Sequence, residues 1–295
     1  MKKLKGLLII FLASVMLLTG CSNAGKNYDA TILKDACRVT SELGYDTVDN
    51  PFKDSSRYFE VVKTSNCEFK VDVNGTEMLI QIPLNSQSEE YVPTNIKPVS
   101  EKYSQIISKS KNLIYRYIDS SSILKDKDGL KNYIDTIDTK EAYFTDDNNV
   151  GAYFSHTDSV LYINTNNTAY ICEWMIVHEF VHAMSYYTHD FSINDEEYAF
   201  NRFNEIMTDI ITFSLNPKIP DTVISGYSFY YSLVYPYINL FGKDAIEAYF
   251  YGYDSIYEKI DHNEFHFFVI VIENYGEENS DVYYNNLILK WYANK

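Results

Sequence analysis

The stretch from Trp174 to Met184 constrains the fold of this chain more than any other. It reads WMIVHEFVHAM, so two histidines and a glutamate interrupt an otherwise apolar segment. Such a segment predicts a helix inside the core. On a helix, positions i and i+4 share a face, so His178 and His182 aim their imidazoles at one point, and Glu179 lies one residue round. The pattern His-Glu-x-x-His therefore predicts a metal site, most simply for Zn²⁺.

Two histidines are too few for such a site, because a catalytic zinc takes three protein ligands and leaves a fourth position for water. His189 follows His182 by seven residues, which is roughly 10 Å along a helix and out of reach of the same ion. Glu196 and Glu197 follow a predicted loop, and their carboxylates suit the start of the next helix. None of these three residues is expected to be a ligand.

The best candidate for the third ligand is Glu205. Glu205 and Asp209 form an i, i+4 pair on a predicted helix over residues 198–215, whose other positions are largely apolar. Two acids in such surroundings are costly to bury unless they meet positive charge or a metal. Glu205 would complete a site with His178 and His182, and Asp209 could accept the free ring N–H of His178.

The order of these residues resembles the gluzincin branch of the zinc metallopeptidases. The resemblance rests on His-Glu-x-x-His followed by Asn-Glu-x-x-x-Asp, and it covers residues 174–213. It implies a zincin-like fold and a zinc-dependent peptidase. The implied metal ligands are His178, His182 and Glu205. Glu179 is implied as the catalytic acid/base, and Asp209 as the carboxylate that supports His178.

In such an enzyme, zinc lowers the pKa of water, and Glu179 takes the proton as the water attacks a peptide carbonyl. The resemblance also implies an edge strand before the metal helix that binds extended peptide, for which residues 160–163 are in place. A second donor must stabilise the oxyanion. The sequence leaves that donor open among His262, His266, Tyr227, Tyr230 and Tyr231, with a preference for His262 because Asp261 precedes it.

The first twenty residues are predicted to be a signal peptide. Three lysines precede an apolar run from Leu7 to Leu18, which is shorter than the roughly 20 residues of a membrane span. Leu18-Thr19-Gly20-Cys21 resembles the lipobox of bacterial lipoproteins, which implies a lipid on Cys21 and a location on the extracellular face of the cell membrane. An ordinary cleaved signal peptide is the alternative, and both imply export.

Without residues 1–20 the chain keeps 22 basic and 41 acidic residues, a net charge of −19. This charge argues against nucleic acid and anionic lipid head groups as partners, because both favour basic surfaces. The bilayer is therefore a partner only through acylated Cys21. Cys37 and Cys67 could form a disulfide bond, whereas Cys172, beside the metal helix, is expected to be a buried free thiol.

The sequence predicts an α+β fold. Residues 1–20 are the signal peptide, 21–30 a lipidated tether, 31–92 a small β-rich N-terminal domain, and 101–295 a mostly helical metallopeptidase domain with a small antiparallel sheet before the active-site helix. A Pro-containing stretch over 85–100 reads as a linker. Strands are expected at 58–62, 67–73, 77–82, 151–154 and 160–163, a hairpin turn at Asn74-Gly75, and helices at 101–118, 127–137 and, after an N-cap at Thr168, 169–187.

Two functions from different classes follow. The first is a membrane-anchored extracellular zinc peptidase that acts on peptides or proteins. The second is a surface binding or adhesin-type lipoprotein with a non-catalytic metal site or none. A structural zinc usually has a closed shell of cysteine and histidine. The set of two histidines and a glutamate therefore favours catalysis.

Overall fold

The structure, a computed structural model, describes residues 28–34, 59–65, 68–73, 76–81, 92–144, 150–167, 171–189, 201–218, 230–274 and 280–294. The predicted signal peptide, the lipidation site Cys21, the Cys37 and Cys67 pair, Thr168, Glu196, Glu197 and Tyr227 lie outside these ranges. Its strands are β1 (Phe59–Ser65), β2 (Glu68–Val73), β3 (Thr76–Gln81), β4 (Pro93–Pro98), β5 (Asp138–Phe144), β6 (Ala152–Ser155) and β7 (Val160–Asn164).

The helices run from the middle of the chain to its end. They are α3 (Glu101–Ser120), α4 (Lys127–Thr136), the short 3-10 helix η1 (Thr165–Asn167), α5 (Glu173–His189), α6 (Asn201–Leu215), α7 (Tyr231–Phe241), α8 (Lys243–Tyr251), α9 (Asp254–Tyr257), α10 (His262–Glu273) and α11 (Ser280–Ala293). Residues 28–34 are helical as well. The described part of the chain is thus mostly helical with two small sheets, which agrees with the predicted α+β class.

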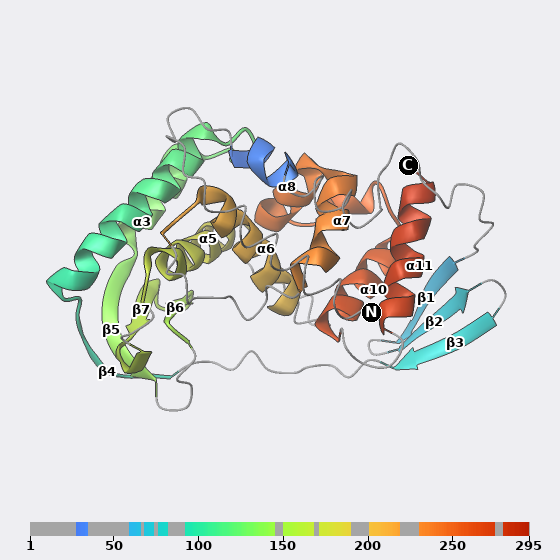
Figure 1. Cartoon of the computed structure of the whole chain (residues 1–295), viewed down its shortest axis with the longest axis horizontal. Helices are drawn as coiled ribbons and strands as arrows, with labels where there is room; N and C mark the ends of the chain where they lie inside the picture. The colour runs from blue at the N-terminus through green and yellow to red at the C-terminus, as the bar shows by residue number, and fades with distance from the viewer. Residues whose placement is uncertain are drawn as a thin grey trace, which may run out of the picture.

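The N-terminal strands form an antiparallel sheet in the order β1-β2-β3. Val73 at the end of β2 pairs with Thr76 at the start of β3, which confirms the predicted pairing of the two strands as a hairpin. The predicted turn residues Asn74 and Gly75 lie outside the described residues. β1 packs against α10 and α11, so this sheet lies beside the C-terminal helices (Figure 1).

The second sheet has four strands in the order β4-β5-β7-β6. It was expected to be antiparallel, but it is mixed, because β5 and β7 run parallel. The chain passes from β5 to the outer strand β6 and returns through a tight turn to place β7 between them. β5 was not predicted, because it opens with the polar run Asp-Thr-Lys-Glu before its buried residues Ala142 and Phe144.

The edge strand nearest α5 is β6, not residues 160–163. Those residues belong to β7, which is paired on both sides, with β5 and with β6. The prediction of a substrate-binding edge at 160–163 was therefore wrong. Its reason is topological: both short strands look alike in sequence, and only the pairing shows which one is outermost.

The predicted linker over 85–100 was also wrong in part. Pro93–Pro98 form β4, which pairs with β5 at the other edge of the sheet. A proline lacks the N–H that a central strand needs, so it is accepted at the ends of an edge strand. Pro93 and Pro98 occupy those two ends.

Residues 28–34 form a helix that packs on the helical domain. Tyr28 and Ile32 are buried in the main core, and the Tyr28 ring lies edge-on to Tyr117 of α3. Asp29 is fully buried and accepts hydrogen bonds from the Ser121 hydroxyl and the Ser122 amide just after α3. These contacts place Tyr28 and Asp29, the last part of the predicted tether, in the core.

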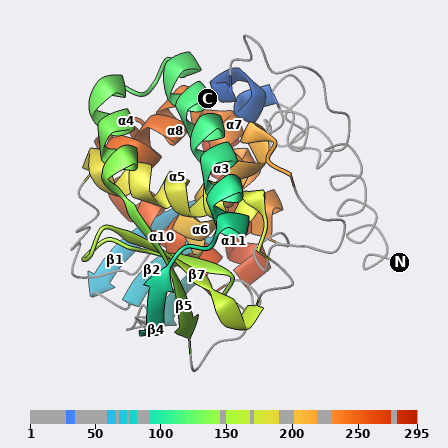
Figure 2. The ribbon, with the colours of Figure 1, turned by 90° about the vertical axis from the view of Figure 1, so that its left-hand side faces the viewer.

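The helix α5 lies at the centre of the molecule. It contacts α3, α4, α6, α8 and β6, and Figures 1 and 2 show it between the four-stranded sheet and the C-terminal helices. Ile176, Val177, Phe180 and Val181 are fully buried, which explains why apolar residues surround the His-Glu-x-x-His motif. The helix starts at Glu173, four residues later than predicted. No helix among the described residues is long and apolar enough to cross a membrane.

Candidate metal centre

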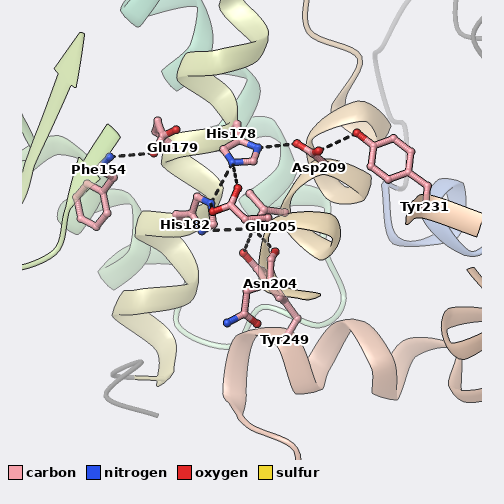
Figure 3. Close-up of polar contacts among 10 residues, drawn as sticks. Phe154, His178, Glu179, His182, Asn204, Glu205, Asp209, Tyr231 and Tyr249 are labelled. Atoms are coloured by element: carbon pink, nitrogen blue, oxygen red, sulfur yellow. Dashed lines mark hydrogen bonds and ion pairs between the residues drawn. The ribbon is translucent and has the colours of Figure 1, made fainter. Parts of the chain in front are cut away.

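Two helices bring the three predicted ligands together. His178 and His182 project from one face of α5 towards Glu205 on α6 (Figure 3). His178 Nε2 lies 3.0 Å from His182 Nε2 and 3.1 Å from Glu205 Oε2, and His182 Nε2 lies 3.2 Å from Glu205 Oε1. This cluster, in which His178 is buried and His182 and Glu205 are partly buried, could hold a metal ion.

Asp209 contacts His178 at the ring nitrogen that does not face the cluster. Its Oδ1 lies 2.8 Å from Nδ1 of His178, and the Tyr231 hydroxyl of α7 donates to its Oδ2 at 2.8 Å. The Asp209 side chain is fully buried. A carboxylate beside Nδ1 favours a proton on that nitrogen and turns the lone pair of Nε2 to the cluster.

His182 has a different support. Its Nδ1 lies 3.4 Å from the Thr208 hydroxyl, and Thr208 is fully buried on α6 beside Asp209. The same hydroxyl lies 2.6 Å from the Tyr249 hydroxyl of α8. The two imidazoles are thus backed by adjacent residues of one helix.

The distances within the cluster fit a bound metal. A tetrahedral ion with bonds of about 2.0–2.1 Å holds its ligand atoms about 3.3 Å apart, close to the observed 3.0–3.2 Å. With both Nδ1 atoms turned to Asp209 and Thr208, two imidazole lone pairs and a carboxylate converge on one point. Such a group is favourable only around a cation, either a metal ion or a bound proton.

The pKa values of His178 and Glu205 each depend on the charge and hydrogen bonds of the neighbouring groups. Burial lowers the pKa of His178, but hydrogen bonds to Asp209 and Glu205 and their charges outweigh it and hold that pKa well above its ordinary value. Burial raises the pKa of Glu205, but the charge of His182 and hydrogen bonds from both imidazoles hold it well below its ordinary value. Glu205 is therefore a carboxylate, ready to bind a cation.

Glu179 stands apart from this cluster. Its Oε2 accepts a hydrogen bond of 2.9 Å from the Phe154 amide of β6 (Figure 3). Burial raises the pKa of the Glu179 carboxyl, and the charges of His178 and His182 oppose the rise. A carboxyl with a raised pKa is better matched to accepting a proton near neutral pH.

The candidate oxyanion donors that the structure describes make contacts with other residues. Tyr231 reaches the centre, but as the partner of Asp209. His266 is buried, and its Nε2 lies 3.2 Å from the Tyr257 hydroxyl. The His262 ring lies against the His266 ring in a tilted arrangement. Asp261 does not support His262 as expected, because it caps α10 by accepting from the Asn263 and Glu264 amides.

Tyr230 and Cys172 lie beside the helices of the centre. The Arg202 guanidinium lies over the Tyr230 ring. Cys172 is a buried free thiol, as predicted, and burial raises its pKa. His189 is the last residue of α5, and nothing further is described of its side chain.

Three contacts at the centre were missed by the sequence analysis. They are the Thr208 hydroxyl, the Tyr249 hydroxyl and the Phe154 amide. A hydroxyl beside Asp209 on the ligand helix was a usable hint for Thr208. Tyr249 comes from a distant helix in a chain of 28 tyrosines, and a backbone amide leaves no mark in the sequence.

A search of protein-family models, curated proteins and solved structures finds no match to this chain.

Proposed function

We propose that this protein is a zinc-dependent peptidase of the gluzincin type, anchored outside the cell through Cys21. The observation that carries the proposal is the convergence of His178, His182 and Glu205, with Asp209 behind the first ligand. Three protein ligands leave one position of a tetrahedral zinc for water or substrate, which is the arrangement of catalytic rather than structural sites.

His178, His182 and Glu205 would hold the zinc, which when bound supplies a Lewis acid that lowers the pKa of water towards ~7. Glu179 then accepts the proton of the attacking water and returns it to the leaving amine. The Phe154 amide fixes one oxygen of Glu179 and leaves the other for this transfer. The raised pKa of Glu179 supports that role.

The strand β6 offers a place for the substrate. It is the outermost strand on the side of α5, and the Phe154 amide points away from β7 towards Glu179. An extended peptide that pairs with a free strand edge gains backbone hydrogen bonds without regard to its sequence. A peptide laid along β6 would thus run past the catalytic carboxylate.

The proposal is tested with purified mature protein. We expect about one zinc per chain by elemental analysis, cleavage of casein or a peptide library, and loss of cleavage with a chelator. Glu179→Gln should abolish hydrolysis while zinc stays bound, because no ligand is removed. Glu173→Gln, the same change at the start of α5, is the matched control and should cleave as the wild type does.

Hydrolysis at the wild-type rate by Glu179→Gln would contradict the mechanism. A protein that holds no zinc and shows no chelator-sensitive cleavage would favour the other candidate, a surface binding lipoprotein.

A further inference from the structure

The hydroxyl of Thr208 lies at the meeting point of three polar groups. It is 2.8 Å from the Asn204 carbonyl oxygen, 2.6 Å from the Tyr249 hydroxyl and 3.4 Å from His182 Nδ1. Thr208 is fully buried, so water does not replace any of these partners at its side chain.

The number of hydrogens on these groups fixes which of them donates in each hydrogen bond. A carbonyl oxygen can only accept, so the single hydroxyl hydrogen of Thr208 goes to Asn204. The oxygen of Thr208 then has two lone pairs left. Tyr249 must therefore donate to the first, and the second faces His182 Nδ1, which must carry a hydrogen to bind it.

We propose that Thr208 is a positioning residue, which sets the tautomer and ring orientation of His182 by accepting the hydrogen on Nδ1. Tyr249 assists because its own donated hydrogen keeps the Thr208 oxygen an acceptor. With Nδ1 protonated, the lone pair of Nε2 points to His178 and Glu205, where the ion would sit. This inference rests on the proposed metal site and deepens it.

The chain holds a matched control one turn along the same helix. Thr212 is also fully buried on α6, and its hydroxyl has no hydrogen-bond partner among the described residues. Thr208→Val and Thr212→Val thus delete the same atom from the same helix. They differ in whether that atom faces a predicted ligand.

The test measures zinc affinity by competition with a chromogenic chelator. Thr208→Val should bind zinc about 10-fold more weakly than the wild type, the lower end of the effect expected for a group that orients a ligand. Thr212→Val should match the wild type. Thr208→Ser keeps the hydroxyl and should restore the affinity, and Tyr249→Phe should weaken it less than Thr208→Val does.

A spectroscopic readout separates positioning from packing. In protein loaded with Co²⁺, the visible absorption bands report the ligand geometry, and they should change in Thr208→Val but stay as in the wild type in Thr212→Val and Thr208→Ser. If Thr208→Val is unfolded by circular dichroism, the same comparison is made between Thr208→Ala and Thr212→Ala.

Equal zinc affinity of Thr208→Val and Thr212→Val would overturn the inference and leave the proposed peptidase standing. Failure of Thr208→Ser to restore affinity would overturn it as well, because the methyl group rather than the hydroxyl would then matter. A wild-type protein that binds no zinc would instead refute the proposed function, and the inference with it.

Discussion

The helices α5 and α6 meet at the candidate metal centre, but largely different parts of the molecule hold them. α5 rests on α3, α4 and β6, on the side of the four-stranded sheet, and it also contacts α8 of the C-terminal helices. α6 is held by the C-terminal helices: Glu273 of α10 accepts the Arg202 and Phe203 amides at its start, and Tyr231 of α7 binds Asp209. The centre therefore lies where the part of the molecule with the four-stranded sheet meets the C-terminal helices, and its geometry depends on how these two parts pack.

The packing of Phe203 shows how firmly α6 belongs to the C-terminal side. This fully buried ring lies against the rings of Tyr237, Tyr253, Phe265 and Phe268. Glu205 is two residues further along α6, so this aromatic cluster places the third predicted ligand. The two histidines are placed by α5, which packs on the sheet side and on α8.

The largest effect is expected where α6 touches His178, a predicted ligand on α5. Asp209→Asn should weaken zinc affinity roughly 10- to 100-fold, because the amide no longer offers His178 a charged acceptor. Chelator competition measures the change, and Asp119→Asn, at an exposed aspartate of α3, is the control. Unchanged affinity in Asp209→Asn would show that α6 supports His178 in no significant way.

A smaller effect is expected one contact further from the metal. Tyr231→Phe removes the hydrogen bond to Asp209 Oδ2 but leaves the carboxylate in place. Zinc affinity should fall about 2- to 10-fold, which corresponds to the ~0.5–1.5 kcal/mol of one hydrogen bond. Tyr237→Phe, at a buried tyrosine of the same helix, should leave it unchanged. A loss as large as that of Asp209→Asn would mean that Tyr231 acts on more than Asp209.

The smallest effect concerns the start of α6. Burial raises the pKa of Glu273 from 4.5 to about 7, against the opposing Phe203 and Arg202 amides and the Arg202 charge. Between these two values the folded protein binds a proton that the unfolded chain does not, so folding stability falls as the pH rises through this window. Glu273→Gln lacks the titrating carboxyl, so its folding stability should not show this contribution to the pH dependence.

Melting temperatures of the metal-free wild type and Glu273→Gln, measured at both ends of the window, test this prediction. At the acidic end of the window, the melting temperature of the wild type should be higher relative to that of Glu273→Gln than it is at the other end. An equal difference at both ends would show that Glu273 does not change its protonation on folding.

Much of the fold could be read from local patterns. The strands of both sheets other than β4 and β5, the hairpin between β2 and β3, and the helices α3 and α4 follow from periodicity and turn residues. β4 and β5 were not found, because prolines and a polar start hide an edge strand and its neighbour from any periodic pattern. The parallel pairing of β5 with β7 depends on contacts between segments about twenty residues apart.

The sequence by itself determined the chemistry of the centre. A four-residue spacing on one helix aims His178 and His182 at one point, and the same spacing on a second helix places Glu205 and Asp209 on one face, whatever the rest of the chain does. That two acids among apolar residues must meet a cation follows from the cost of burying charge.

Only the tertiary structure decided which groups surround that chemistry. Tyr249, Tyr231 and the Phe154 amide reach the centre from helices and a strand that are distant in sequence. Thr208 lies on α6 beside Asp209, but its contact with His182 of α5 depends on how the two helices pack. Their roles depend on distances of about 3 Å between separate elements, and hydrogen bonds are lost beyond that range. Residue types and spacing along the chain cannot fix such distances, because the packing of α5 against α6 and the C-terminal helices sets them.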